Sequence, residues 1–109
     1  MRVVALLVVF LFAVLTSNVW SLDAEQWFLD GNRLSAEEKF EEAAKAYQKS
    51  IDQNPLAPVA HYNLGIAYKN LRQLDKAAKS LEKAVELAPT NLDIRLTLGN
   101  VYNLQERWK

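Results

Sequence analysis

The side chains able to do acid–base or nucleophilic chemistry are few and scattered in this chain of 109 residues. It has one histidine, His61, and no cysteine, whereas a zinc site needs several such ligands at close spacing. A serine hydrolase needs a serine with a base and an orienting group. Ser35, Ser50 and Ser80 lie in helical patterns without a G-x-S-x-G context. The sequence therefore predicts no enzyme activity and no metal or cofactor site.

The densest charge cluster is acidic and contains Glu37, Glu38, Glu41 and Glu42. As a site it would bind a cation or a basic partner. Carboxylates at a helix start also complement the helix dipole, and Glu41 and Glu42 precede Lys45 at ion-pair spacing. We interpret the cluster as a solvated helix start, since no calcium-loop motif is present. The whole chain balances 13 basic against 13 acidic residues, which indicates no nucleic-acid partner.

The side chains best suited to binding are asparagines in helical segments. They are Asn32, Asn63, Asn70, Asn100 and Asn103. Asparagine is a poor helix former, so its recurrence asks for a reason. A side-chain amide carries a donor and an acceptor and can hold an extended peptide backbone. Solvent exposure alone is the alternative explanation.

Helices must position these residues, because the apolar positions recur with a helical period. We expect helices at 24–36, 39–53, 58–70, 74–87 and 91–105, and no strand. Asp23 with Gln26 resembles a capping box at the first start, and Thr90 with Asp93 is expected to cap the fifth helix. Pro58 stands where the third helix begins, a position that tolerates the missing N–H.

The helices repeat with a fixed period. Gly31, Gly65 and Gly99 are each 34 residues apart. The same offset relates Ala43 to Ala77, Tyr47 to Leu81, and Pro55 to Pro89. Such a period indicates stacked copies of one helical unit that bury a continuous core together. We expect each glycine to allow the close approach of a partner helix.

The spacing resembles the tetratricopeptide repeat (TPR) pattern, W-x2-L-G-x2-Y followed by A-x3-F and P. The matching residues are Trp27, Gly31, Leu34, Ala43, Tyr47 and Pro55; then Leu64, Gly65, Tyr68, Ala77, Leu81 and Pro89; then Leu98, Gly99 and Tyr102. Asp30, His61 and Arg95 depart from the pattern. The resemblance implies an all-α solenoid of antiparallel helix pairs, with full repeats at 24–57 and 58–91 and a truncated third at 92–109. It also implies that His61 fills a buried packing position.

The resemblance implies a concave groove, lined by the first helix of each repeat, that binds a peptide or a helical segment of another protein. The expected groove residues are Phe28, Asn32 and Ser35; Tyr62, Ile66, Lys69 and Asn70; and Leu96, Asn100 and Asn103.

One TPR subclass grips a C-terminal carboxylate with basic residues and two asparagines. Asn32 and Asn63 match those asparagines, but Phe28, Asp93 and Thr97 stand where the basic residues should be. The substitutions disfavour a carboxylate tail as the ligand.

The third repeat has only the opening of its second helix. We therefore expect Leu98, Val101, Tyr102 and Trp108 to form an exposed apolar edge, because no following helix covers them. Either another chain covers this edge, or the sequence is a truncated version of a longer protein. The first explanation suggests a second function, that of an assembly subunit that forms homo-oligomers through its third repeat.

The N-terminus has the features of a targeting segment. Arg2 precedes an apolar run at residues 3–15, which as a helix spans about 20 Å and falls short of a membrane core of roughly 30 Å. We expect a signal peptide at 1–21 and a TPR domain at 22–109. An uncleaved membrane anchor that extends to Leu22 and a helix of the fold are the alternatives. Both the signal peptide and the uncleaved anchor place the repeats outside the cytoplasm, in the periplasm or a secretory lumen.

Overall fold

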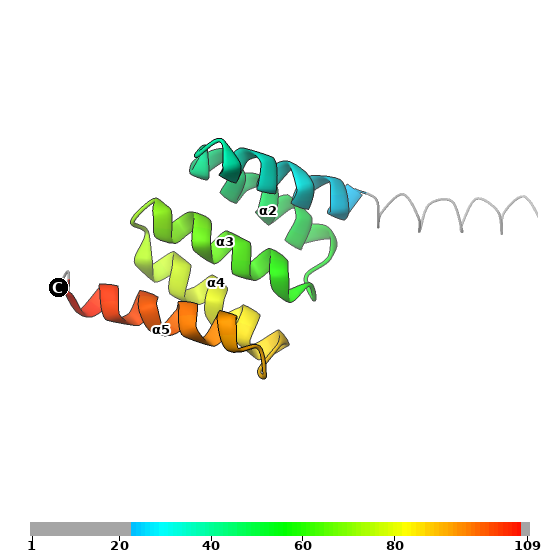
Figure 1. Cartoon of the computed structure of the whole chain (residues 1–109). Helices are drawn as coiled ribbons and strands as arrows, with labels where there is room; N and C mark the ends of the chain where they lie inside the picture. Colours follow the sequence, from blue (N-terminus) through cyan, green and yellow to red (C-terminus); the bar gives the residue numbers. More distant parts are fainter. Residues whose placement is uncertain (1–22, 108–109) are drawn as a thin grey trace, which may run out of the picture.

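The computed structural model describes residues 23–107 and confirms the all-helical fold (Figure 1). The first helix covers residues 23–36. It is followed by α2 (Phe40–Gln53), α3 (Pro58–Asn70), α4 (Leu74–Leu87) and α5 (Leu92–Arg107). These bounds agree with the expected ones to within two residues, and no described residue lies in a strand. The expectations for the signal segment and for Trp108 fall outside the described residues.

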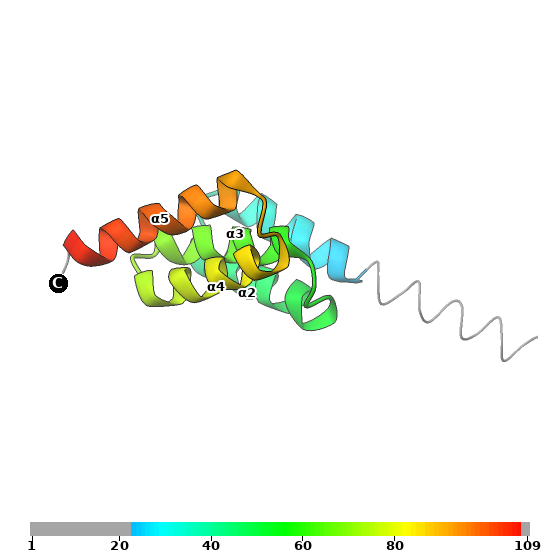
Figure 2. The ribbon, with the colours of Figure 1, turned by 90° about the horizontal axis from the view of Figure 1, so that it is seen from below.

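The helices form two layers of antiparallel neighbours. In Figure 2 the first helix, α3 and α5 make up one layer, and α2 and α4 make up the other. Within residues 23–107, no helix is long and apolar enough to cross a membrane.

The turns inside the first two repeats are alike. Glu38 and Arg72 occupy the same repeat position, and both have left-handed backbones, with φ of 61° and 64°. The Lys39 amide donates to the Leu34 carbonyl at 2.9 Å, and the Gln73 amide donates to the Tyr68 carbonyl at 2.9 Å. This is the Schellman arrangement, which closes the open carbonyls of a helix end.

Two expected helix starts differ in detail. The Asn91 side chain, rather than that of Thr90, caps α5, because its Oδ1 accepts the Ile94 amide at 3.1 Å. Asp23 is already helical, whereas a capping residue stands just before its helix. Pro58 is the first residue of α3, as expected.

The core consists of two apolar clusters. The first lies between the first helix, α2 and α3, with Leu34, Ala43, Tyr47 and Leu64 among its members. The second lies between α4 and α5 and contains Leu74, Ala77, Ala78, Leu81 and Val101. Tyr68 packs against both clusters, so the two repeats share a continuous interior.

Gly31 and Gly65 mark close contacts between the helices of one repeat. A Cβ atom at Gly31 would lie 2.6 Å from the Tyr47 ring, and one at Gly65 would lie 2.6 Å from Cγ of Leu81. The expected close approach does not extend to Gly99, where an added Cβ would meet nothing within 4 Å. The reason is that no helix packs over Gly99 among the described residues.

Candidate binding surface

Three helices carry the expected binding residues, and polar side chains connect them. We call the surface of the first helix, α3 and α5 that carries Asn32, Tyr62, Asn63 and Leu96 the inner face. These three helices belong to one layer (Figure 2). The two contacts described next join the first helix to α3 and α3 to α5.

Asn32 and Asn63 meet at the centre of the inner face. Asn63 Nδ2 donates to Asn32 Oδ1 at 3.0 Å, and the Tyr47 hydroxyl donates to the same oxygen at 2.7 Å. Ser35 Oγ lies 3.3 Å from the Tyr47 hydroxyl oxygen. Because the Tyr47 hydroxyl donates its single hydrogen to Asn32 Oδ1, Ser35 Oγ is the donor in its contact with the Tyr47 hydroxyl oxygen.

The hydrogen bonds fix how the asparagine pair is oriented. Both protein donors go to Asn32 Oδ1, which leaves the Asn32 amide nitrogen as a donor and Asn63 Oδ1 as an acceptor. A peptide unit offers the complementary groups, a carbonyl oxygen and an N–H. In an extended chain the N–H and C=O of one residue point to the same side, so the pair can face both groups of one ligand residue.

A second polar contact joins α3 to α5. The Thr97 hydroxyl donates to the Asp93 carbonyl at 2.8 Å, so the Tyr62 hydroxyl, 3.4 Å from Thr97 Oγ1, is the donor of that weaker contact. Beside it, between α3 and α5, lies a hollow of about 210 Å³ lined by Val59, Tyr62, Asp93 and neighbouring residues.

The other expected groove residues differ in how open they are. Leu96 is 60% exposed, and Asn70, Asn100 and Asn103 are also exposed, while Ile66 and Lys69 are half-buried. Asn70 donates its Nδ2 to the Ile66 carbonyl of its own helix at 3.0 Å. Phe28 packs partly into the first core cluster, with its ring centroid 5.9 Å from that of Tyr47. Phe28 is therefore in part a core residue.

Asn63 did not belong to the expected groove set, although the carboxylate-binding pattern had singled it out. Its offset of 31 residues from Asn32 is not the repeat period, so periodicity alone does not pair the two. No group of three or more His, Asp and Glu residues within 23–107 is placed to hold a metal ion.

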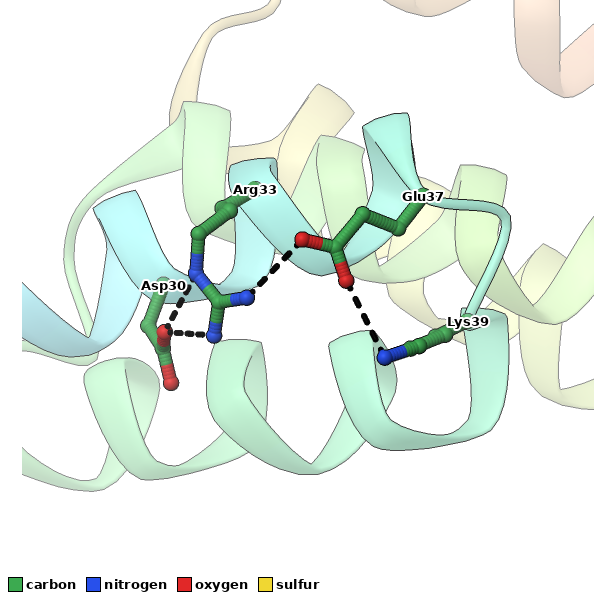
Figure 3. Close-up of polar contacts among 4 residues, drawn as sticks. All are labelled: Asp30, Arg33, Glu37 and Lys39. Atoms are coloured by element: carbon green, nitrogen blue, oxygen red, sulfur yellow. Dashed lines mark hydrogen bonds and ion pairs between the residues drawn. The ribbon is translucent and has the colours of Figure 1, made fainter.

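The first helix and the turn that follows it carry a cluster of paired charges. Arg33 contacts Asp30 at 2.7 Å and Glu37 at 3.0 Å, and Lys39 contacts Glu37 at 3.2 Å (Figure 3). We call these four residues the leading face. The hydrogen bond from Lys39 lowers the pKa of Glu37 most, and the hydrogen bond from Arg33 lowers it further. Bonds to Asp30 and then Glu37 raise the pKa of Arg33.

The expected exposed edge of α5 is wrong in part. Val101 is fully buried, and Leu98 is half-buried against the second core cluster. Both residues occupy the positions of Ala67 and Leu64, 34 residues earlier, which pack toward the preceding repeat. Trp108 lies outside the described residues.

Tyr102 does remain 43% exposed. Its hydroxyl donates to Glu82 at 2.7 Å, and this bond to a carboxylate raises the pKa of Tyr102. With Arg95 and Gly99, which are exposed on the same helix, it forms what we call the trailing face.

Known proteins match the repeats. The family described as "Tetratricopeptide repeat" matches residues 58–91, and "TPR repeat" matches 31–71. Hsp70-Hsp90 organizing protein 1 of Glycine max is 37% identical over 60 residues, which cover 55% of this chain and 10% of the relative. Protein O-mannosyl-transferase TMTC3 of Homo sapiens is 31% identical over 98 residues, which cover 77% of this chain and 11% of the relative.

The crystal structure of MamA superposes with a TM-score of 0.75 at 25% identity, over 77% of this chain and 49% of that one. The chain covers about half of MamA but only about a tenth of the length of the curated relatives it matches. The 34-residue period, the contacts at Gly31 and Gly65 and both family matches agree, and the chain belongs to the tetratricopeptide repeat family.

Proposed function

We propose that this chain is a protein-interaction module whose inner face binds an extended peptide or a helical segment of another protein. Membership of a repeat family supports this proposal, since stacked helical repeats create extended surfaces suited to protein ligands. The relative from Glycine max is named Hsp70-Hsp90 organizing protein 1, and this name is consistent with the proposal.

The observation that carries the proposal is the oriented asparagine pair. Asn32 presents a donor and Asn63 an acceptor on neighbouring helices, which matches the backbone C=O and N–H of one residue in an extended ligand rather than a particular side chain. Half-buried Tyr62 on α3 and exposed Leu96 on α5 supply apolar area on the same layer of helices. The arrangement favours a ligand recognised through its backbone, with apolar side chains adding affinity.

A ligand with a free carboxylate terminus is disfavoured. Asp93 places a negative charge where a carboxylate-binding site carries a basic residue, and the Thr97 hydroxyl is committed to the Asp93 carbonyl. A carboxylate near Asp93 would experience repulsion instead of an ion pair. Internal peptide segments fit the inner face better than chain ends.

The test begins with a displayed library of random peptides selected on the purified protein. We expect Tyr62→Ala to weaken the selected synthetic peptide by more than about 1–2 kcal/mol, since buried aromatic anchors dominate interface energies. Leu96→Ala should weaken it as well without disturbing the fold, because Leu96 is 60% exposed.

The matched control is Glu86→Ala on α4, in the other layer, which should leave the affinity unchanged. Unfolding of each variant in urea separates lost binding from lost structure. An affinity that falls with Glu86→Ala but not with Leu96→Ala would place the site away from the inner face and overturn the proposal.

We propose that the chain is not an enzyme, although one relative is named as a transferase. The single histidine supports this: His61 is buried, and its Nε2 donates to the Pro55 carbonyl at 2.8 Å. A histidine held in this way has a packing role and no access to a substrate.

We also propose that the repeats are exported, on the strength of Arg2 and the apolar run at residues 3–15. A reporter that is active only in the cytoplasm, fused after Lys109, should then give no signal. A fusion that lacks residues 1–21 is the matched control and should be active. A signal from the full-length fusion would overturn the export proposal but would leave the binding proposal standing.

A further inference from the structure

The hollow between α3 and α5 has a size and a lining that suit one apolar side chain of a ligand. Its volume is about 210 Å³, whereas pockets for drug-sized molecules span roughly 300–1,000 Å³. Carbon-rich side chains make up most of the lining, which consists of Pro58, Val59, Tyr62, Ala88, Asn91, Asp93 and Ile94. Val59 is 50% exposed and Ile94 is 4% exposed, so an incoming group meets both accessible and buried apolar surface.

The hollow lies at one end of the inner face. Figure 1 shows that the first helix, α3 and α5 all begin at the same end of the stack, and Asp93 belongs to the first turn of α5. Asn63 stands four residues after Val59 on α3, a spacing that puts two side chains on the same face of a helix, about one turn apart. One extended ligand segment can therefore contact both the asparagine pair and the hollow.

Most polar groups beside the hollow already have partners. Asn91 Oδ1 accepts the Ile94 amide at 3.1 Å, and the Tyr62 hydroxyl lies 3.4 Å from Thr97 Oγ1. The Asp93 carboxylate is different, because it forms no hydrogen bond or ion pair with any residue in the range 23–107. Asp93 is also exposed. The hollow therefore has a negative charge at its edge that is available to a ligand.

The surrounding charges leave the edge of the hollow negative. Glu25 holds the repeat position of Asp93 in the first helix, and it is exposed. Arg95 is two residues from Asp93, a spacing at which helical side chains do not face each other. Lys69 is ten residues after Val59, which places it about 15 Å farther along α3. The charge at the hollow is therefore complementary to a basic group of a ligand.

We propose that the hollow is a subsite that selects an aliphatic side chain together with a lysine or arginine two positions away in the same ligand segment. The aliphatic side chain fills the hollow, and the basic one pairs with the Asp93 carboxylate. In an extended chain, side chains two positions apart point to the same side, so both reach the site together. Because Tyr62 of the inner face lines the hollow, the subsite rests on the peptide binding proposed above and narrows its ligand to a basic, internal segment.

The probes for the test are three synthetic peptides with blocked ends and the same flanking glycines and serines. Their central residues are Leu-Ser-Lys, Leu-Ser-Glu and Ser-Ser-Lys. In NMR spectra of the purified protein labelled with ¹⁵N, the first peptide should shift the amides of Val59, Tyr62 and Ile94 and saturate at millimolar concentration. The second should bind about two- to five-fold more weakly, the size of an exposed ion pair. The third should lose roughly ten-fold, because it leaves the hollow empty.

Variants of the protein separate the charge from the apolar contact. Asp93→Asn should remove the preference for lysine over glutamate, and Asp93→Lys should reverse it, a response that a merely apolar surface would not give. Val59→Ser should weaken the first peptide several-fold without changing that preference. Glu42→Gln, which removes an exposed carboxylate from α2 in the other layer, is the matched control and should change nothing. The same spectra report whether each variant is folded.

Two outcomes would overturn the subsite. They are the absence of shifts beside the hollow up to millimolar Leu-Ser-Lys peptide, and a charge preference that Asp93→Asn and Asp93→Lys leave unchanged. The peptide selected from the random library then decides how far the failure extends. If Leu96→Ala still weakens that peptide, only the subsite is wrong and the inner face remains a binding surface. If it does not, peptide binding at the inner face is wrong as well.

Discussion

At the scale of single residues, the chain places ordinary side chains in unusual backbone positions. Glu38 has φ of 61°, a left-handed conformation that costs an L-residue roughly 1–2 kcal/mol and that glycine adopts freely. The side chain of Glu38 is exposed, so it adds little packing in return. The turn therefore stores strain that a single substitution can relieve.

We expect Glu38→Gly to raise the free energy of unfolding by about 1 kcal/mol, since it removes the left-handed strain. Ala36→Gly, two residues earlier in the helix, is the control and should lower stability by about 1 kcal/mol through helix propensity. Urea unfolding measures both. If Glu38→Gly destabilises as much as Ala36→Gly does, the turn is not strained.

The three glycines provide a second comparison at this scale. Gly65→Leu should destabilise the protein by about 1–3 kcal/mol, because the new side chain collides with Leu81. Gly99→Leu should be neutral or stabilising by up to about 1 kcal/mol, because it meets open space and improves helix propensity. Equal losses in thermal or urea unfolding would contradict the assignment of Gly65 to a helix contact.

At the scale of elements, the sequence was sufficient to locate the helices, but it did not predict correctly which faces of α5 are buried. The proline positions and the 34-residue period located all five helices to within two residues. The period also identified the closely packed Gly31 and Gly65. It did not say which side of α5 faces α4, so Leu98 and Val101 were expected to be exposed when in fact they pack inward.

A direct comparison of repeat positions would have corrected this error. Leu98 and Val101 align with Leu64 and Ala67, apolar residues on the side that faces the preceding repeat, whereas Gly99 and Tyr102 align with the side that faces the following helix. The Asn32–Asn63 pair was harder to find. Its geometry depends on how two helices cross, and local sequence does not encode that crossing.

The start of α5 offers an element-scale prediction. Asn91→Ala should cost about 1 kcal/mol of stability, because the Ile94 amide loses its capping oxygen. Thr90→Ala should have little effect, since the Thr90 side chain is exposed and does not cap the helix. Thermal unfolding of the two variants checks this, and a larger loss for Thr90→Ala would restore the cap expected from sequence.

At the scale of the whole molecule, the two ends of the stack differ in chemistry. The leading face carries charged side chains that pair with one another in solvent, and such exposed pairs add little stability but keep the end soluble. The trailing face carries an exposed aromatic residue and an uncovered glycine. The two described faces therefore differ in packing: the leading face consists of charged pairs, and the trailing face leaves Gly99 uncovered.

This polarity predicts how stability is distributed. In a stack of repeats, stability is approximately a sum of contacts between neighbouring units. Helix α3 is packed against both α2 and α4, whereas α5 is packed mainly against α4. We expect the amides of α5 to exchange hydrogen faster than those of α3, because α5 can detach without opening the rest.

Completion of the third repeat should remove that difference. By the 34-residue offset, Lys109 aligns with Asp75, so a copy of residues 76–90 appended after Lys109 would continue α4-like packing in register. The copy of Leu81 would then cover Gly99. We expect a higher Tm and slower exchange throughout α5, and the same extension with the copied leucine changed to alanine should give a smaller gain. If α5 is already as protected as α3 in the natural chain, or if the extension leaves its exchange unchanged, the trailing face is not an open packing surface.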